Sequence, residues 1–256
     1  MIEIRQFPAR DDNYGVLVHD PDSGATASID APDEDAIVDA LEETGWRLTD
    51  IFVTHHHYDH VEAVKALKAR FGVRVVASAY DTERGRVPEV DRAVVDGEHV
   101  FLGRTRFEVI AVPGHTLGHV AYHVPSDHAV FAGDTLFALG CGRLFEGTPG
   151  QMWASLKTLR ALPPETMVYC GHEYTQANAR FALTIETDNS ELKRRAKRID
   201  ELRDEGLPTV PSRLAEEIAT NPFLRADVAS VKAALGLLDA PDEAVFAEIR
   251  ERKNRF

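Results

Sequence analysis

The sequence predicts an α/β protein that ends in a smaller helical region, and three observations support this. Short apolar runs of strand length, bounded by turn residues, recur along the chain as far as Cys170. Helical patterns are interleaved with them, which is typical of α/β folds. After Tyr174 the strand-like runs stop and helical periodicity continues. We therefore expect an α/β domain over residues 1–173 and an α-helical domain over residues 174–256.

The first region contains the expected strands and three expected helices. The strands are Met1–Arg5, Gly15–His19, Ala25–Ile29, Ile51–Thr54, Arg74–Ala77, Phe107–Val112, Val120–His123, Ala129–Ala132 and Met167–Cys170. The helices are Asp33–Thr44, His60–Phe71 and Pro149–Ala161. Thr148 is placed as the N-cap of the last helix, and Pro149 stands at its first position, where a backbone N–H would have no helical partner.

The second region is expected to consist of short helices. They are Ala177–Thr187, Glu191–Glu205, Arg213–Ala219, Val228–Leu237 and Asp242–Glu251. Turn signals at residues 206–208 and 221–222 separate some of them. We expect the basic run Lys193–Arg198 to be a solvated helix face.

Composition restricts the class of protein. A chain of 256 residues with 44% hydrophobic content can bury a core without disulfides, so Cys141 and Cys170 are expected to be free thiols. The N-terminal segment lacks a secretory h-region and no run is long enough to span a bilayer, which favours a cytoplasmic protein that does not bind membranes. A net charge of −13 argues against a nucleic-acid partner. We expect a monomer or weak oligomer.

The segment from Thr54 to His60, THHHYDH, predicts a metal site. It follows an expected strand and leads into an expected helix. In extended chain His55 and His57 face the same side, whereas His56 points elsewhere. Asp59 and His60 then lie at the start of the helix. Imidazole nitrogen and carboxylate oxygen are ligands that divalent metals such as Zn²⁺ prefer.

Three further segments supply ligands of the same kind, each in a glycine-containing turn after an expected strand. They are Pro113-Gly114-His115, Gly133-Asp134-Thr135 and Gly171-His172-Glu173. The spacing favours two divalent ions per chain, with zinc first and iron or manganese as alternatives. The expected ligands are His55, His57 and His115 for one ion and Asp59, His60 and His172 for the other, with Asp134 shared. An open position on each ion is typical of a catalytic site.

The HxHxDH pattern followed by lone His, Asp and His residues resembles the metallo-β-lactamase superfamily. This resemblance implies a four-layered αββα sandwich over residues 1–173, with the helical domain appended. A closer similarity to glyoxalase II, the hydroxyacylglutathione hydrolases, is carried by CGRLFEGT, GHEYT, NPFLR and the terminal RERKNRF. It implies hydrolysis of a glutathione thioester, S-D-lactoylglutathione in first place, as in methylglyoxal detoxification.

The same resemblance implies which residues contact glutathione. They are Arg143, Phe145, Tyr174, Arg250 and Lys253, mainly from the turn after Asp134 and from the basic C-terminus. Cations suit the two carboxylates of glutathione. The family usually has lysine where this chain has Arg143 and tyrosine where it has Phe145. The arginine keeps the charge, whereas the phenylalanine removes one hydrogen bond.

The expected mechanism is attack on the thioester carbonyl by a hydroxide formed between the two ions. Asp59 and Asp134 are the expected catalytic carboxylates, because both are ligands and Asp59 can also orient the nucleophile. Alternatives are a glutathione persulfide dioxygenase with one iron, a metal-dependent lactonase or β-lactamase, and a binding protein that retains metal without turnover. A nucleophilic role for Cys141 is disfavoured because no activating base is evident. His56, His119 and Glu173 could orient ligands or simply pack.

Overall fold

The computed structural model describes residues 1–256, and its contacts divide the chain into two compact units. Unit 1 comprises Met1–Ala111 and Thr116–Gly133, and unit 2 comprises Val112–His115 and Asp134–Phe256. This division by spatial contacts differs from the expected boundary between residues 173 and 174, which stays a prediction. No helix combines the length and the apolar composition needed to cross a bilayer.

A mixed sheet in the order β1-β2-β3-β4-β5-β6 forms one layer of unit 1. Its strands are β1 (Glu3–Ala9), β2 (Asn13–Asp20), β3 (Ala25–Ile29), β4 (Leu48–Phe52), β5 (Arg74–Ser78) and β6 (Arg92–Val94). The first three pair antiparallel, whereas β3 to β6 pair in parallel. Each parallel pair is joined by a connection that contains a helix, as such crossovers require.

A second layer of unit 1 is an antiparallel meander. It consists of β7 (His99–Leu102), β8 (Thr105–Ala111), β9 (Val120–Val124) and β10 (Ala129–Gly133), with the 3₁₀ turn η1 (Pro125–Asp127) before the last strand. The two layers meet through aromatic side chains: the ring of Phe52 lies 5.2 Å from that of Phe107 and 5.4 Å from that of Tyr122. The buried Tyr122 hydroxyl donates to the Val53 carbonyl at 2.9 Å.

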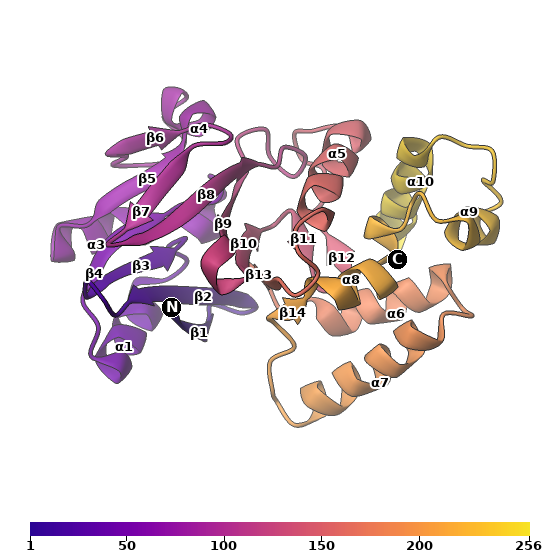
Figure 1. The fold of residues 1–256 in the computed structure, drawn as a ribbon, viewed down its shortest axis with the longest axis horizontal. Coiled ribbons are helices and arrows are strands. Elements are labelled where there is room, and N and C mark those ends of the chain that lie inside the picture. Colours follow the sequence, from indigo (N-terminus) through magenta and orange to yellow (C-terminus); the bar gives the residue numbers. More distant parts are fainter. The chain divides into compact units, whose positions relative to one another are not determined.

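Helices cover the other face of the mixed sheet (Figure 1). They are α1 (Glu34–Thr44), α2 (Tyr58–Val61) and α3 (Val64–Phe71), and a further short helix, α4 (Ala79–Glu83), follows β5. Ile37 and Leu41 of α1 and Leu67 of α3 share a core with Leu17 and Val75 of the sheet. The burial of these apolar faces holds the layers together.

The helix expected over residues 60–71 is wrong as a single element, because the chain forms α2 and α3 instead. The backbone explains the break. Ala31 accepts a hydrogen bond from the Ala63 N–H at 3.0 Å and donates to the His60 carbonyl at 2.8 Å. The His60 carbonyl and the Ala63 N–H therefore form hydrogen bonds outside the helix. His60 is fixed in this way against the segment that follows β3.

Unit 2 is mainly helical, with two short strand pairs. Its elements are β11 (Leu136–Phe137), β12 (Gly140–Cys141), α5 (Pro149–Arg160), β13 (Met167–Cys170), α6 (Thr175–Ile185), α7 (Ser190–Asp204), β14 (Ser212–Arg213), α8 (Leu214–Thr220), η2 (Pro222–Leu224), α9 (Ala229–Leu235) and α10 (Asp242–Arg255). Thr148 is the N-cap of α5, as the sequence predicts, and the structure adds a capping box with Gln151. Helices α6 and α7 lie side by side (Figure 1) and bury Ala179, Ala182, Leu192 and Ile199.

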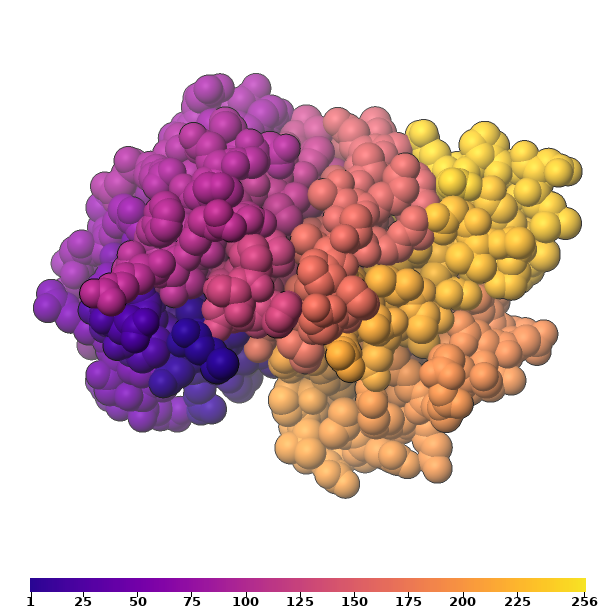
Figure 2. All heavy atoms as spheres, in the orientation of Figure 1, coloured from indigo at the N-terminus to yellow at the C-terminus, as the bar shows by residue number.

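Several short elements are absent from the sequence prediction. Strands β6, β7, β11, β12 and β14 have two to four residues each, too few for an alternating pattern to stand out. In the run Lys193–Arg198, most side chains are exposed on α7, the light-orange segment of Figure 2. Arg195 is an exception: it is buried, so the interpretation of the whole run as a solvated face is wrong at this residue.

Candidate metal centre

Unit 1 contributes four of the expected ligands, all in the segment that follows β4. His55 and His60 are buried, and their ring centroids are 4.1 Å apart. His55 Nε2 lies 3.1 Å from His57 Nδ1, and His60 Nε2 lies 3.5 Å from Asp59 Oδ2. The segment therefore gathers His55, His57, Asp59 and His60 into one cluster, as their spacing predicts.

Asp30 supports this cluster, and the sequence analysis missed it. Its carboxylate accepts hydrogen bonds from the Thr54 N–H at 2.6 Å, the Thr54 hydroxyl at 2.8 Å and His60 Nδ1 at 2.7 Å. With Nδ1 as donor, His60 keeps the lone pair on Nε2, which is the atom on the side of Asp59. The signal that could have found Asp30 is its position directly after β3. This strand pairs with β4, the strand that leads into the histidines.

Asn13 is a second supporting residue that the sequence analysis missed. Its side-chain amide donates to Asp59 Oδ2 at 3.0 Å and lies 3.3 Å from the Asp59 carbonyl oxygen. Asn13 is buried, whereas Asp59 is partly exposed. The amide therefore holds one oxygen of a partly exposed carboxylate in a fixed position.

His56 and His119 flank the cluster without joining it. His56 Nδ1 lies 3.3 Å from an oxygen of Asp81, which is fully buried. The ring of His119 stacks on that of His55, with centroids 4.6 Å apart and planes 14° apart. A Cβ at Gly133 would lie 2.8 Å from the His119 ring. His119 thus packs against an expected ligand, and Gly133 leaves room for it.

Unit 2 contributes the other three expected ligands. His115, Asp134 and His172 are buried. Asp134 Oδ2 lies 3.5 Å from His115 Nε2 and 3.3 Å from His172 Nε2. His115 Nδ1 donates to the Arg143 carbonyl at 2.8 Å, which leaves the Nε2 lone pair facing Asp134.

The residues of each cluster fit a divalent metal ion. Two ligand atoms at about 2.0–2.1 Å from a tetrahedral ion are about 3.3–3.4 Å apart. The four separations within the clusters are 3.1, 3.5, 3.5 and 3.3 Å. All donors are imidazole nitrogen or carboxylate oxygen, the set that Zn²⁺, iron and manganese accept. The His/Asp clusters therefore imply divalent metal binding.

The residues expected to contact glutathione all lie in unit 2, in different environments. Arg143 and Phe145 are exposed. The ring of Tyr174 stacks on that of His172, with centroids 4.7 Å apart and planes 5° apart. Lys253 is half-buried and donates to the Ala177 carbonyl at 3.1 Å. Burial, followed by the positive charges of Arg250 and Arg143, lowers the pKa of Lys253 to about 8.

Arg250 is buried, unlike Arg143. One guanidinium nitrogen donates to the Cys141 carbonyl at 2.8 Å, and another donates to Asn254 Oδ1 at 3.1 Å. Its guanidinium also lies 5.1 Å from the centroid of the Phe223 ring. Arg250 therefore holds the protein backbone, and its contact with glutathione stays a prediction.

Neither cysteine has the properties of a nucleophile. Both are buried free thiols. Burial raises the pKa of Cys141 to about 11 and that of Cys170 to about 12. Glu173 is also structural: its carboxylate accepts from the Thr209 N–H and hydroxyl at 2.9 and 2.6 Å.

Comparison with known proteins identifies the family. Residues 20–172 match the metallo-beta-lactamase superfamily, and residues 173–256 match the family described as hydroxyacylglutathione hydrolase C-terminus. The chain is 59% identical over 255 residues to a hydroxyacylglutathione hydrolase of Brucella anthropi, a match that covers 100% of this chain and 97% of that protein. The chain belongs to the hydroxyacylglutathione hydrolase family. The protein of the same name from Brucella ovis is 57% identical, with 100% and 98% covered.

Solved structures agree with the fold. ETHE1 from Myxococcus xanthus has a TM-score of 0.68 and 27% identity, over 99% of this chain and 98% of that chain. TTHA1623 in a di-iron-bound form has a TM-score of 0.58 and 31% identity, over 66% and 91% of the two chains. The predicted α/β class, the metallo-β-lactamase fold and the C-terminal helical region are confirmed.

Proposed function

We propose that the chain is a metal-dependent thioesterase that hydrolyses S-(2-hydroxyacyl)glutathione, with S-D-lactoylglutathione as substrate and D-lactate and glutathione as products. The observation that carries this proposal is the identity of 57–59% over the whole chain with proteins named hydroxyacylglutathione hydrolase. The His/Asp clusters of both units supply the ligand types that such a metalloenzyme needs.

The ligands are assigned to two divalent ions, zinc in first place. His55, His57 and His115 serve one ion, Asp59, His60 and His172 serve the other, and Asp134 is shared. Support comes from the ligand separations within each cluster and from a 31% identical solved structure described as di-iron-bound. When bound, such ions supply Lewis acidity and lower the pKa of water toward about 7, so that hydroxide is available near neutral pH.

The protein's own residues hold and orient the reacting groups. Asp30 and the Arg143 carbonyl each accept from a histidine Nδ1, which keeps the Nε2 lone pairs of His60 and His115 available. The Asp59 carboxylate, fixed by Asn13, accepts a hydrogen bond from the attacking water and aligns it with the thioester carbonyl. A thiolate is a good leaving group, so no strong general acid is required.

Recognition of glutathione depends on charge and on an aromatic surface. Arg143 and Lys253 bring positive charge toward the substrate carboxylates, a requirement in a chain of net charge −13. Tyr174, which is stacked on His172 and is 36% exposed, offers its ring to the substrate. Phe145 is 63% exposed and provides apolar contact without a hydroxyl. Arg250, although buried, adds its positive charge.

The test is an assay of the purified protein with S-D-lactoylglutathione, together with metal analysis. We expect one thiol released per thioester consumed and close to two metal ions per chain. Oxygen consumption with glutathione persulfide by protein that holds one iron would overturn the proposal in favour of a dioxygenase.

The variant Asp134→Ala is expected to lose most turnover and part of the bound metal, because it removes a shared ligand. The control is Asp239→Ala, which removes an exposed carboxylate of the same unit. Full activity and full metal content in Asp134→Ala would refute the assignment of Asp134.

A further inference from the structure

A buried hairpin, residues 136–141, follows Asp134, and its backbone is held by side chains of the helical region. Five consecutive residues of this hairpin, 137 to 141, each bond to such a side chain. Asn221 donates to the carbonyls of Phe137 and Gly140 at 3.2 and 3.1 Å, Asn178 donates to that of Ala138 at 3.1 Å, Arg250 donates to that of Cys141 at 2.8 Å, and the Leu139 N–H donates to Glu217 at 2.8 Å.

The hairpin cannot fix its own conformation. Each of its strands has two residues, and residues 136 to 141 are all buried. Leu139 at the turn has φ of 56°, in the left-handed region that disfavours a branched apolar residue. Buried backbone groups must find hydrogen-bond partners, and here the partners are side chains from α6, α8 and α10 and from Asn221. These side chains therefore determine where the hairpin lies.

Glu217 is the centre of this arrangement. It is fully buried, and one carboxylate oxygen accepts from both the Leu139 N–H and the Asn221 amide, at 2.8 and 3.1 Å. Its other oxygen pairs with Arg195, which is also buried and donates to the Thr220 hydroxyl at 2.8 Å. A buried carboxylate needs such a counter-charge. Arg195 therefore supplies the counter-charge to the carboxylate that accepts from the hairpin.

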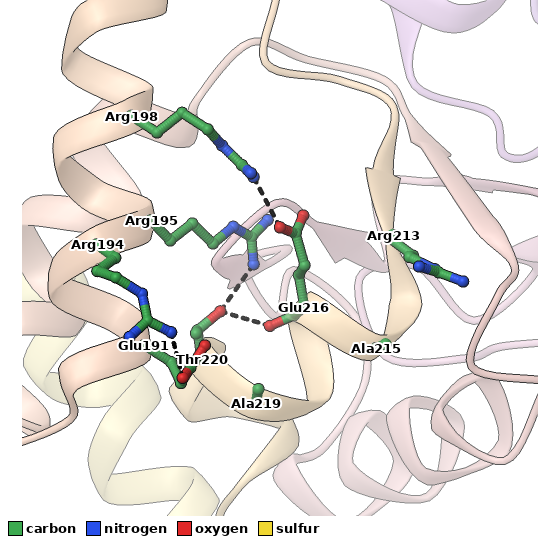
Figure 3. Close-up of a pocket in the computed structure, with 9 residues that line it drawn as sticks. All are labelled: Glu191, Arg194, Arg195, Arg198, Arg213, Ala215, Glu216, Ala219 and Thr220. Atoms are coloured by element: carbon green, nitrogen blue, oxygen red, sulfur yellow. Dashed lines mark hydrogen bonds and ion pairs between the residues drawn. The ribbon is translucent and has the colours of Figure 1, made fainter.

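The pocket outside this pair does not give Arg195 another role. A cavity of about 540 Å³ between α7 and α8 is lined by four arginines, with Glu191 and Glu216 among the other lining residues (Figure 3). Arg198 pairs with Glu216 at 2.8 Å, and Arg194 pairs with Glu191. Arg213 points away from these pairs (Figure 3). The three guanidinium groups of α7 at this pocket are therefore paired, and we assign it no anion.

Both ends of the hairpin lead to expected metal ligands. The hairpin begins two residues after Asp134, and the Gly142 N–H donates to the Thr135 carbonyl at 3.4 Å. A Cβ at Gly142 would lie 2.0 Å from the Asp134 carbonyl oxygen, so the two backbones are in direct contact. The next carbonyl, that of Arg143, holds His115 Nδ1 at 2.8 Å.

We propose that Arg195, Glu217 and Asn221 are positioning residues for the metal centre. They fix the hairpin of residues 136–141, and the hairpin in turn places the Asp134 carboxylate and orients the His115 imidazole. The inference rests on the proposed function only in taking Asp134 and His115 as metal ligands. It also gives a physical role to Asn221, the first residue of the NPFLR segment.

The test compares two variants within that segment. Asn221→Asp keeps the shape and the acceptor for the Phe223 N–H, but it places a carboxylate oxygen against two carbonyl oxygens of the hairpin and against the Glu217 carboxylate. Arg225→Lys is the matched control: it breaks the two-pronged pairing of Arg225 with Glu186, at 2.7 and 2.9 Å, which does not involve the hairpin. Both variants should melt at a lower temperature than the parent protein.

Three measurements on full-length, zinc-loaded protein, made well below the melting temperatures, separate positioning from stability. They are zinc affinity by chelator competition, amide hydrogen exchange of residues 136–143, and kcat and KM for the thioester. In Asn221→Asp we expect zinc affinity to fall at least tenfold, exchange of the hairpin to rise at least tenfold and kcat to fall more than KM changes. In Arg225→Lys all three should stay within twofold of the parent.

Wild-type zinc affinity and exchange in a folded Asn221→Asp protein would overturn the inference, and so would equal effects in both variants. If Asn221→Asp does not fold, the same measurements on Asn178→Asp test the inference, because this variant removes only the hydrogen bond to the Ala138 carbonyl. That variant should lose at least threefold in zinc affinity, and no loss overturns the inference. A parent protein that binds zinc but does not hydrolyse the thioester would refute the proposed function, while zinc affinity and exchange would still judge the positioning role.

Discussion

Raising the pH from 7 to 9 is expected to raise KM for the glutathione thioester about tenfold through Lys253, whose pKa is lowered to about 8. Burial disfavours the ammonium form, and the positive charges of Arg250 and Arg143 add to the effect. With this pKa the lysine is about 90% charged at pH 7 and about 10% charged at pH 9. If only the charged form binds the substrate carboxylate, affinity is nearly full at pH 7 and falls as the pH rises through about 8.

The assay is KM against pH for the parent protein and for Lys253→Arg, with the rate of spontaneous thioester hydrolysis subtracted. Arginine stays charged over this range, and every titration of the substrate is common to both proteins. The ratio of their KM values therefore isolates the lysine and should rise about tenfold from pH 7 to pH 9. A ratio that stays constant, with Lys253→Met showing an unchanged KM at pH 7, would refute both the contact and the reasoning.

Three further perturbations test other parts of the site. Asp30→Asn should lower metal affinity, measured by chelator competition, by about 10- to 100-fold, because it loosens His60. The control Asp50→Asn, at a buried carboxylate paired with Arg74, should leave metal affinity unchanged. Gly142→Ala should lower the free energy of unfolding by about 1–3 kcal/mol in urea titrations, because its Cβ would lie 2.0 Å from the Asp134 carbonyl oxygen; unchanged stability would contradict that contact. Phe145→Tyr should lower KM about 2- to 12-fold, equivalent to a hydrogen bond of about 0.5–1.5 kcal/mol, with kcat unchanged, and a higher KM would contradict the expected substrate contact.

Local features of the site could be predicted from the sequence. The cluster of His55, His57, Asp59 and His60 lies within six residues, so strand geometry and one helix start suffice to bring the side chains together. The supporting residues could not be found in this way. Asp30 and Asn13 contact expected ligands 30 and 46 residues away, and these pairings depend on the order of strands in the sheet.

The sequence predicted the long elements of the fold but not the short ones. The predicted N-cap of α5, Thr148, is confirmed, because the N-cap and the proline after it are adjacent in the sequence. The break between α2 and α3 was not foreseen, because it depends on Ala31, about thirty residues earlier in the chain, taking two backbone hydrogen bonds. Sequence periodicity contains no information about a partner at that distance.

Arg195 shows how a charge pattern can hide a buried residue. It stands in a basic run, where a solvated side chain is the ordinary interpretation. Its spacing gave the opposite signal: Leu192, Ala196 and Ile199 form the buried stripe of α7, and Arg195 lies three residues after the first of them. A cation on an apolar stripe requires a buried anion. That anion is Glu217, 22 residues later, which in turn holds the hairpin beside Asp134. The helical region is therefore tied to the hairpin beside Asp134 by an ion pair, and not only through the residues expected to bind substrate.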